Sequence, residues 1–173
     1  MAMIDIFNIQ PTQLCKDLRG RFVLLYGQAK SGKTSMSAMW PKPLLVAFEK
    51  GYNALPGVLA QDITTWGQMK EVLRELKKPE VKAAFNVVVV DGVDIAADQC
   101  TKYICNQNGI DSLGDLGYGK GWSKFKTEFN EVFRGLTQMG YAVFFIGHDK
   151  EGKDDNGNIT NIRPLLSNST REV

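Results

Sequence analysis

The eight residues that decide the fold read Gly27-Gln28-Ala29-Lys30-Ser31-Gly32-Lys33-Thr34. They fit the P-loop pattern, in which a glycine, four free positions and a second glycine precede Lys and then Ser or Thr. The glycines allow a tight turn that points successive backbone N–H groups into one anion-sized hollow. Lys33 brings a mobile positive charge to the β- and γ-phosphates, and the Thr34 hydroxyl is a small, hard ligand for Mg²⁺. The stretch therefore predicts a site for nucleotide phosphates.

The segments on either side of this loop agree with the prediction. Residues 21–26 are a short apolar run, as expected of a buried strand that leads into the loop. Residues 34–40 carry apolar side chains at helical spacing and stop before Pro41. The alternative, a glycine turn with incidental lysines, would not need this strand–loop–helix setting. We therefore expect the stretch from Gly27 to Ser35 to bind ATP.

Length and composition set limits on the fold and on the class of protein. The chain has 173 residues, 43% of them apolar, so we interpret residues 1–173 as one α/β domain. A net charge of +2 gives no global cationic field, and nucleic acid would have to bind to a local patch. The thiols of Cys15, Cys100 and Cys105 form no CxxC pair, which favours free cysteines in the cytosol. Without a leader or a membrane-length apolar run, we expect an intracellular protein with no membrane partner.

Apolar runs alternate with helical periodicities along the rest of the chain. Strands are predicted at 44–48, 85–90 and 141–146, and helices at 65–78, 93–105 and 125–139. A weak apolar segment at Ile4, Ile6 and Ile9 indicates an edge strand or a cover over the core. The alternation predicts a mainly parallel sheet with helices on both faces.

Polar residues that follow the strands should meet the P-loop at one edge of this sheet, because ligands bind at the carboxyl ends of parallel strands. Asp91 ends an apolar strand at the Walker B position, where a carboxylate holds Mg²⁺ through water. The alternative for Asp91 is an ordinary acid that begins a turn. Glu49 is the other carboxylate expected at a strand end, since Gly92 follows Asp91. We predict that Glu49 positions the attacking water; the alternative is a surface ion pair with Lys50.

His148, the sole histidine, comes just after the predicted strand 141–146, with Gly147 between them. It could sense the γ-phosphate and pass this information to the next segment, or it could only cap the strand end through hydrogen bonds. Beyond it lie Lys150, Lys153 and Arg163, which could contact nucleic acid, contact phosphates of a neighbouring subunit, or form a solvated basic loop. The sequence Asp-Asn-Gly at 155–157 is typical of a hairpin turn.

The stretch 106–121 contains five glycines and is predicted to be a long loop. It carries Tyr118 and Lys120, and Trp122 follows directly. Aromatic side chains beside a lysine can stack nucleic-acid bases and neutralise phosphates. A lid over the nucleotide would use similar residues, and a disordered connector is the third interpretation.

Together these segments resemble a RecA-type ATPase, and more closely the phage-encoded RecA-like AAA-domain proteins linked to single-strand annealing and recombination. The resemblance extends from about Phe22 to Leu166 and rests on four segments, Gly27–Thr34, Val46–Gly51, Val87–Asp91 and Phe144–Lys150. The first and third segments are generic to P-loop ATPases. The second and fourth are more particular, since RecA-like proteins place a catalytic Glu after the second strand and a polar sensor after the fourth.

The resemblance implies that the 141–146 strand lies between the P-loop strand and the strand that ends in Asp91. His148 would then lie against the γ-phosphate, at a position where RecA itself has glutamine. It also implies that 106–121 and 149–163 are two DNA-facing loops of an oligomer. Related cores add strands beyond the position of Val173, which suggests a shortened domain.

We therefore predict a Mg²⁺-dependent ATPase that acts on DNA, single-stranded by preference, as a homo-oligomer in the cytoplasm of a phage-infected host. Lys33, Glu49 and His148 would be catalytic, and Thr34 and Asp91 would hold Mg²⁺. One alternative is a nucleotide or small-molecule kinase, which the lack of arginines in the long loop disfavours. The other is a non-hydrolysing DNA-annealing or assembly module switched by ATP.

Overall fold

A five-stranded parallel sheet forms the centre of the structure, a computed structural model that describes residues 17–156 and 158–166. Its strands are, in spatial order, β1 (Phe22–Tyr26), β5 (Ala142–Gly147), β4 (Val87–Asp91), β2 (Pro43–Ala47) and β3 (Ala60–Asp62). Every neighbouring pair is parallel. The predicted α/β fold is therefore confirmed, and β5 lies between the P-loop strand and the Asp91 strand. The predicted segment at 4–9 and Cys15 lie outside the described residues.

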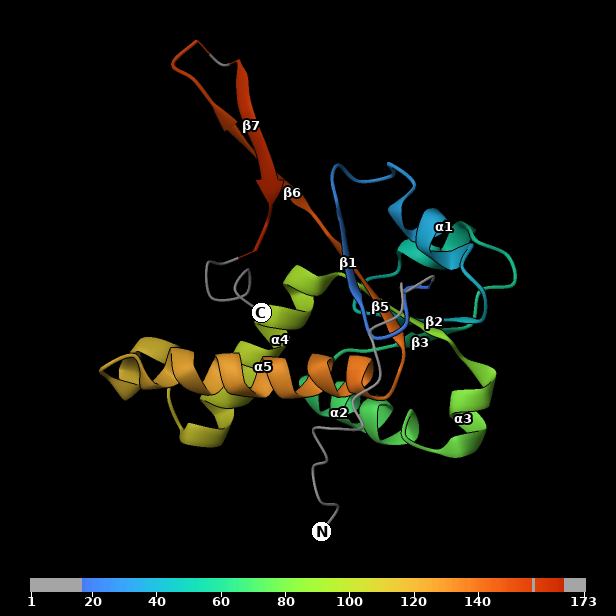
Figure 1. The fold of residues 1–173 in the computed structure, drawn as a ribbon. Coiled ribbons are helices and arrows are strands. Elements are labelled where there is room, and N and C mark those ends of the chain that lie inside the picture. Colours follow the sequence, from blue (N-terminus) through green and yellow to red (C-terminus); the bar gives the residue numbers. More distant parts are fainter. Residues whose placement is uncertain (1–16, 157, 167–173) are drawn as a thin grey trace, which may run out of the picture.

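Helices cover both faces of the sheet, as the sequence predicts (Figure 1). They are α1 (Lys33–Ala38), α2 (Trp66–Glu75), α3 (Pro79–Ala84), α4 (Val93–Asn108), α5 (Lys120–Gln138), and the short 3-10 helices η2 (Gly51–Ala54) and η3 (Leu113–Leu116). The larger group, α2, α4 and α5, packs on the face that carries Val88, Val90 and Val143. On the opposite face, Trp40, two residues beyond the end of α1, packs on Phe144, with ring centroids 5.4 Å apart. None of the described helices has both the length and the apolar character of a membrane span.

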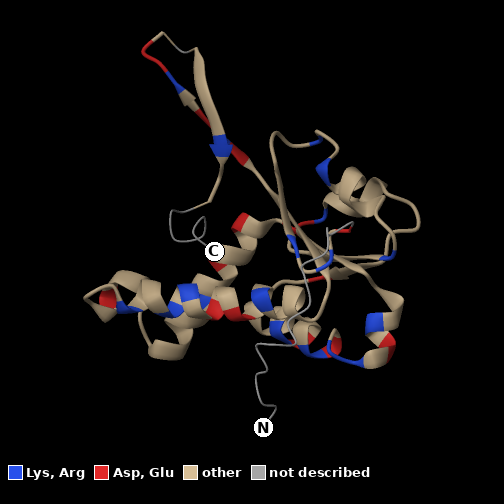
Figure 2. Cartoon of the chain, viewed as in Figure 1, with Lys and Arg blue, Asp and Glu red and all other residues tan. Residues whose placement is uncertain are grey.

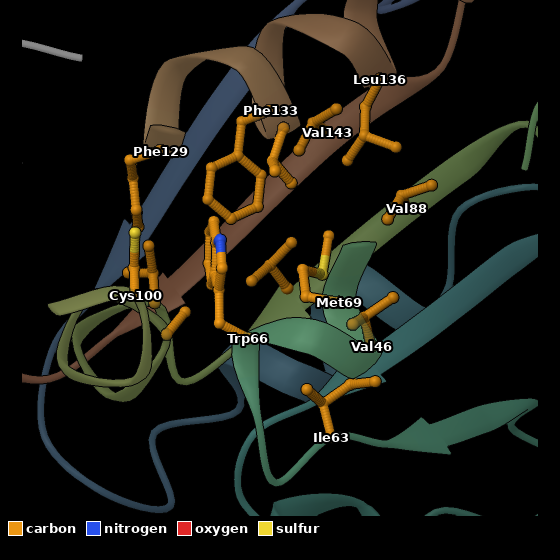
Figure 3. Packing of buried hydrophobic residues seen from close by; sticks show 14 of the residues in the cluster. Val46, Ile63, Trp66, Met69, Val88, Cys100, Phe129, Phe133, Leu136 and Val143 are labelled. Atoms are coloured by element: carbon orange, nitrogen blue, oxygen red, sulfur yellow. The ribbon is translucent and has the colours of Figure 1, made fainter. Parts of the chain in front are cut away.

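The main core lies between the sheet and the larger group of helices. Every residue of β4 is buried, as expected of a central strand of a parallel sheet. Trp66 of α2 packs against Phe129 and Phe133 of α5, with ring centroids 5.6 and 5.9 Å apart (Figure 3). Its Nε1–H donates to Glu128 at 2.9 Å, and Glu128 also pairs with Lys70 at 2.8 Å. Core packing thus fixes the helices that support the carboxyl ends of β4 and β5.

The predicted loop at 106–121 is wrong, because most of this stretch is helical. α4 continues to Asn108, a Ser112–Asp115 capping box begins η3, and α5 begins at Lys120. A Cβ atom at Gly121 would lie 2.0 Å from the carbonyl oxygen of Leu113. Glycine at this position therefore permits close packing of α5 against η3, rather than flexibility.

A β-hairpin projects from the carboxyl end of β5 (Figure 1). It consists of β6 (Asp149–Lys153) and β7 (Ile159–Pro164), which pair in antiparallel fashion with a bulge between Gly152 and Lys153. The hairpin indicated by the turn sequence is confirmed, and the turn begins where Asp154 accepts a hydrogen bond from the backbone N–H of Asn156. Because β5 runs directly into β6, the hairpin begins at His148, at the edge of the sheet where the carboxyl ends of the strands lie.

Candidate nucleotide-phosphate site

The loop at 27–34 connects β1 to α1, as predicted. Gly27 has φ +151° and Gly32 has φ +87°, and Gly32 is the N-cap of α1. Both values lie in a region that side chains with a Cβ atom rarely adopt. The two glycines of the motif are therefore needed to turn the chain from the strand into the helix.

Lys33 folds over the loop that precedes it. Its Nζ donates hydrogen bonds to the backbone carbonyls of Gly27 and Gln28, each at 2.8 Å, and lies 3.5 Å from Oγ of Ser31. The ammonium group is therefore held at the mouth of the loop, where phosphate oxygens would replace the carbonyls as stronger, charged acceptors.

Asp91 ends β4 in a fully buried position beneath the loop. Its Oδ2 accepts a hydrogen bond from Oγ1 of Thr34 at 3.0 Å, while its Oδ1 has no hydrogen-bond partner among the described residues. Burial raises the pKa of Asp91 to about 6, the bond from Thr34 opposes this shift, and the nearby charge of Glu49 adds to it. A desolvated carboxylate with a free oxygen would be stabilised by a cation.

Space for a cation exists beside these two oxygens. A Cβ atom at Gly51 would lie 3.5 Å from Oδ2 of Asp91 and 3.9 Å from Oγ1 of Thr34, so glycine leaves this volume open. Among the described residues, no group of three or more His, Cys, Asp and Glu side chains could hold a metal ion. A carboxylate and a hydroxyl, with water and phosphate completing the shell, are the ligands that Mg²⁺ uses at such sites. The residues therefore fit Mg²⁺.

Glu49 and His148 lie together across from the P-loop, each about one third exposed. Their closest atoms, Oε2 of Glu49 and Nε2 of His148, are 3.6 Å apart. On the other side of the ring, Nδ1 of His148 is 2.9 Å from Oδ2 of Asp94 in α4. This hydrogen bond, with the negative charges of Asp94 and Glu49, raises the pKa of His148, against burial and the charge of Lys33. The sequence did not single out Asp94, which lies three residues after Asp91, in the first turn of α4.

A cavity of about 500 Å³ joins these groups. Its walls are formed by residues 29–35 of the loop, by Glu49–Gly51 with Ala54 and Leu55, and by Ile146 and His148. Of the residues predicted to bind ATP, Gly27 and Gln28 do not line the cavity. The side chain of Gln28 instead points to the hairpin, where its Nε2 lies 3.5 Å from Oε1 of Glu151. The structure thus brings the loop, Glu49 and His148 around one space, with Asp91 beneath it.

Comparison with known proteins agrees with this arrangement. Residues 19–173 match the model of a family described as the AAA domain. The chain is also 37% identical over 173 residues to the SPbeta prophage-derived uncharacterized protein YorG of Bacillus subtilis (strain 168). That match covers 96% of this chain and 54% of the relative, so the chain spans about half the relative's length. With a P-loop, a buried acid below it and a family match over most of its length, this chain belongs to the AAA domain family.

Proposed function

We propose that this domain binds ATP with Mg²⁺ and hydrolyses it, and that hydrolysis is coupled to the binding of single-stranded DNA in a homo-oligomer. Membership of the AAA domain family implies nucleotide binding. The observation that carries the proposal of hydrolysis is the position of Glu49, whose carboxylate lines the same cavity as Lys33 and Thr34. A carboxylate there can orient a water molecule toward a terminal phosphate held by the loop.

Each residue of the site has a proposed role. The backbone of residues 27–35 and the ammonium of Lys33 would bind the phosphates, and Thr34 and Asp91 would hold Mg²⁺. Bound there, Mg²⁺ would neutralise charge on the β- and γ-phosphates. Glu49 would orient the attacking water, and His148 would report the γ-phosphate to the hairpin that follows it.

The proposal of DNA binding rests on the hairpin. Figure 2 shows Lys and Arg residues spread among acidic ones over the helices, which agrees with the small net charge and leaves only local patches for a nucleic acid. Lys150 and Arg163 are exposed cross-strand neighbours that form no ion pair within the described residues. The hairpin also adjoins His148 and contacts Gln28, so nucleotide and DNA could influence each other there. A second candidate surface is near Tyr118 and Trp122, which are 103% and 45% exposed.

Two other functions are compatible with a P-loop. A kinase is less favoured, because the described residues that line the cavity include lysines but no arginine to clamp a transferred phosphate. One observation favours a non-hydrolysing switch, namely that Glu49 contacts His148. If this contact persisted with ATP bound, the carboxylate of Glu49 would not be available to orient the attacking water. The prophage origin of the YorG relative supports a role in phage biology and the cytoplasm of an infected host as the setting.

Steady-state release of phosphate, measured with and without single-stranded DNA, distinguishes these functions. We expect Mg²⁺-dependent release that single-stranded DNA stimulates. Transfer of phosphate to a small acceptor would indicate the kinase, and tight ATP binding without turnover would indicate the switch. The Lys33→Ala variant, prepared in parallel, controls for contaminating ATPases.

A further inference from the structure

Asp94 is a mostly buried acid in the first turn of α4, and its side chain points at His148. The side chain of Asp94 is 15% exposed, and its Oδ2 lies 2.9 Å from Nδ1 of the imidazole. Its Oδ1 is buried without a hydrogen-bond partner among the described residues. A buried carboxylate is costly unless it is paired, so an ordinary surface role does not explain this residue.

Backbone packing fixes the positions of Asp94 and His148 relative to each other. Gly147 ends β5 directly before His148, and Val93 begins α4 directly before Asp94. A Cβ atom at Gly147 would lie 3.1 Å from Cγ1 of Val93, closer than ordinary packing allows. The end of the strand is therefore packed tightly against the start of the helix, and this packing fixes the distance between carboxylate and imidazole.

The partner of one imidazole nitrogen determines what the other can do. Because a carboxylate only accepts, its partner Nδ1 must carry a proton. The remaining nitrogen, Nε2, then points toward Glu49 at 3.6 Å and toward the cavity that both side chains line. In the doubly protonated ring, Nε2–H can donate to a carboxylate or to a phosphate oxygen.

We propose that Asp94 is a positioning residue of the nucleotide site: it holds the Nδ1 proton of His148 and so aims Nε2 at Glu49 and at the position of the terminal phosphate. The inference rests on the proposed function, in which a γ-phosphate oxygen would accept the Nε2–H and leave Glu49 available for the water. Nothing in the sequence motif requires an acid at position 94, since the pairing depends on residues 54 positions apart.

The charges around His148 come from four elements. Asp94 on α4 and Glu49 after β2 favour the protonated ring, and so does Asp91 at the end of β4 when it is ionised, while Lys33 on α1 opposes it. The hydrogen bond to Asp94 contributes most to the raised pKa of His148. Removing the charge of Asp94 should therefore lower this pKa and reduce the cationic fraction of the ring near neutral pH.

Nitrogen-15 NMR of the imidazole tests the inference directly, because His148 is the sole histidine of the chain. The nucleotide-free protein, purified without a histidine tag, would be titrated between about pH 5 and pH 9 while both ring nitrogens are observed. We expect a pKa above that of ordinary histidine and, at high pH, a neutral ring protonated at Nδ1. A neutral ring protonated at Nε2 in the wild-type protein would overturn the proposal without any variant.

Two substitutions separate the charge of Asp94 from its hydrogen bond. Asp94→Asn removes the charge, so the pKa of His148 should fall toward its ordinary value. Asp94→Ala removes the acceptor, so the neutral ring should move to protonation at Nε2. The control is Asp98→Asn, an exposed acid one turn further along α4, which should leave both signals unchanged. Equal spectra for all three variants and the wild type would rule out the positioning role.

Kinetics provide a second, independent readout. Asp94→Asn should lower kcat by up to about a hundredfold, as expected for a misplaced group, with little change in KM for ATP. In a His148→Ala background the same substitution should have no further effect on kcat, because its target is gone. An equal loss in both backgrounds would contradict the inference. Should the wild-type protein release no phosphate at all, the proposed function fails, yet the spectra still decide the role of Asp94.

Discussion

The P-loop edge of the sheet and the β6–β7 hairpin are stabilised in opposite ways, although they adjoin at His148. At the P-loop edge, polar side chains are fixed by partners from other elements, as Thr34 is by Asp91 and His148 is by Asp94. In the hairpin, the two strands pair chiefly with each other and most side chains are exposed. One region is preorganised for a small ligand, and the other presents its groups to solvent.

The charges sharpen this contrast. Beneath the P-loop, buried negative charge lies beside a hydroxyl and an open space, an arrangement that a small cation would stabilise. On the hairpin, Lys150 lies directly opposite Arg163, and like charges at opposed positions destabilise a strand pair by a few tenths to about 1 kcal/mol. In each region, unpaired or like charges therefore destabilise the fold locally, and a bound ligand of opposite charge would remove this destabilisation. The ligands that we propose differ: a metal–nucleotide complex in the first region, and single-stranded DNA, a polyanion, in the second.

The largest effect is expected for Lys33→Ala at the P-loop edge. This variant should bind ATP at least about a hundredfold more weakly, because no neighbour replaces the charge-assisted hydrogen bonds of the ammonium. Calorimetric titration with Mg²⁺–ATP measures the affinity, and Lys82→Ala on the exposed side of α3 removes the same charge away from the cavity. Near-normal affinity for ATP in the Lys33→Ala variant would show that the loop at 27–34 is not the phosphate site.

Glu49→Gln should separate binding from chemistry at the same edge. The substitution keeps the shape of the side chain but removes its charge and basicity, so turnover should fall on the order of a hundredfold while ATP still binds. Phosphate release and ATP affinity would be measured on the same preparation, with Glu80→Gln on α3 as the matched control. If turnover stays intact, another group positions the water.

Much of this edge could be predicted from the sequence, because its signals are local. The P-loop is a contiguous motif, and the valines of β4 indicate a buried strand that ends in Asp91. The parallel alternation of strands and helices then places Glu49 and His148 at the same edge. The roles of these residues stay predictions until variants are measured.

Other features depend on tertiary contacts that a single sequence does not display. β3 is a short edge strand with two exposed residues, so it lacks an apolar pattern. The helix predicted at 65–78 ends before Pro79, but Pro79 itself begins a further helix, α3, in whose first turn proline is favoured. The role of Gly121 depends on Leu113 packing against it, and that of Asp94 on the sheet order that brings β5 beside β4.

Asp91→Asn should reveal how much the buried, ionised carboxylate lowers the free energy of unfolding when no metal ion is bound. Because the pKa of Asp91 is raised from 3.8 to about 6, the folded state loses stability as pH rises through that range. In EDTA at pH 7.5 the variant should therefore be more stable than wild type, by about 1–3 kcal/mol. The gain should shrink at pH 5, and Mg²⁺ with nucleotide should stabilise the variant less than the wild type. Chemical denaturation at both pH values measures this, and a less stable variant at pH 7.5 would contradict the prediction.

Substitutions in the hairpin should have the smallest effects on the fold. They also test most directly the contrast between the preorganised P-loop region and the solvent-facing hairpin. Replacing Lys150 and Arg163 by Ala should weaken binding of single-stranded DNA several-fold at low salt. The slope of log K against log salt concentration should become shallower by about 0.7 for each phosphate contact that is lost. The free energy of unfolding should equal that of wild type or rise by up to about 1 kcal/mol, since an exposed like-charge pair is removed. Lys153→Ala should weaken binding less, because Lys153 already lies 3.5 Å from Glu151.

Fluorescence anisotropy with a labelled oligonucleotide at two or more salt concentrations measures these differences, and Lys82→Ala again serves as the charge-matched control. If the hairpin variants keep the full affinity and salt slope, the DNA site lies elsewhere, and the surface near Tyr118 and Trp122 becomes the next to test. If they instead lose thermal stability, the two basic side chains support the hairpin itself, and the contrast between a preorganised edge and a solvent-facing hairpin is wrong. A loss of DNA affinity at unchanged stability would mean that partner binding and folding depend on separate residues in this domain.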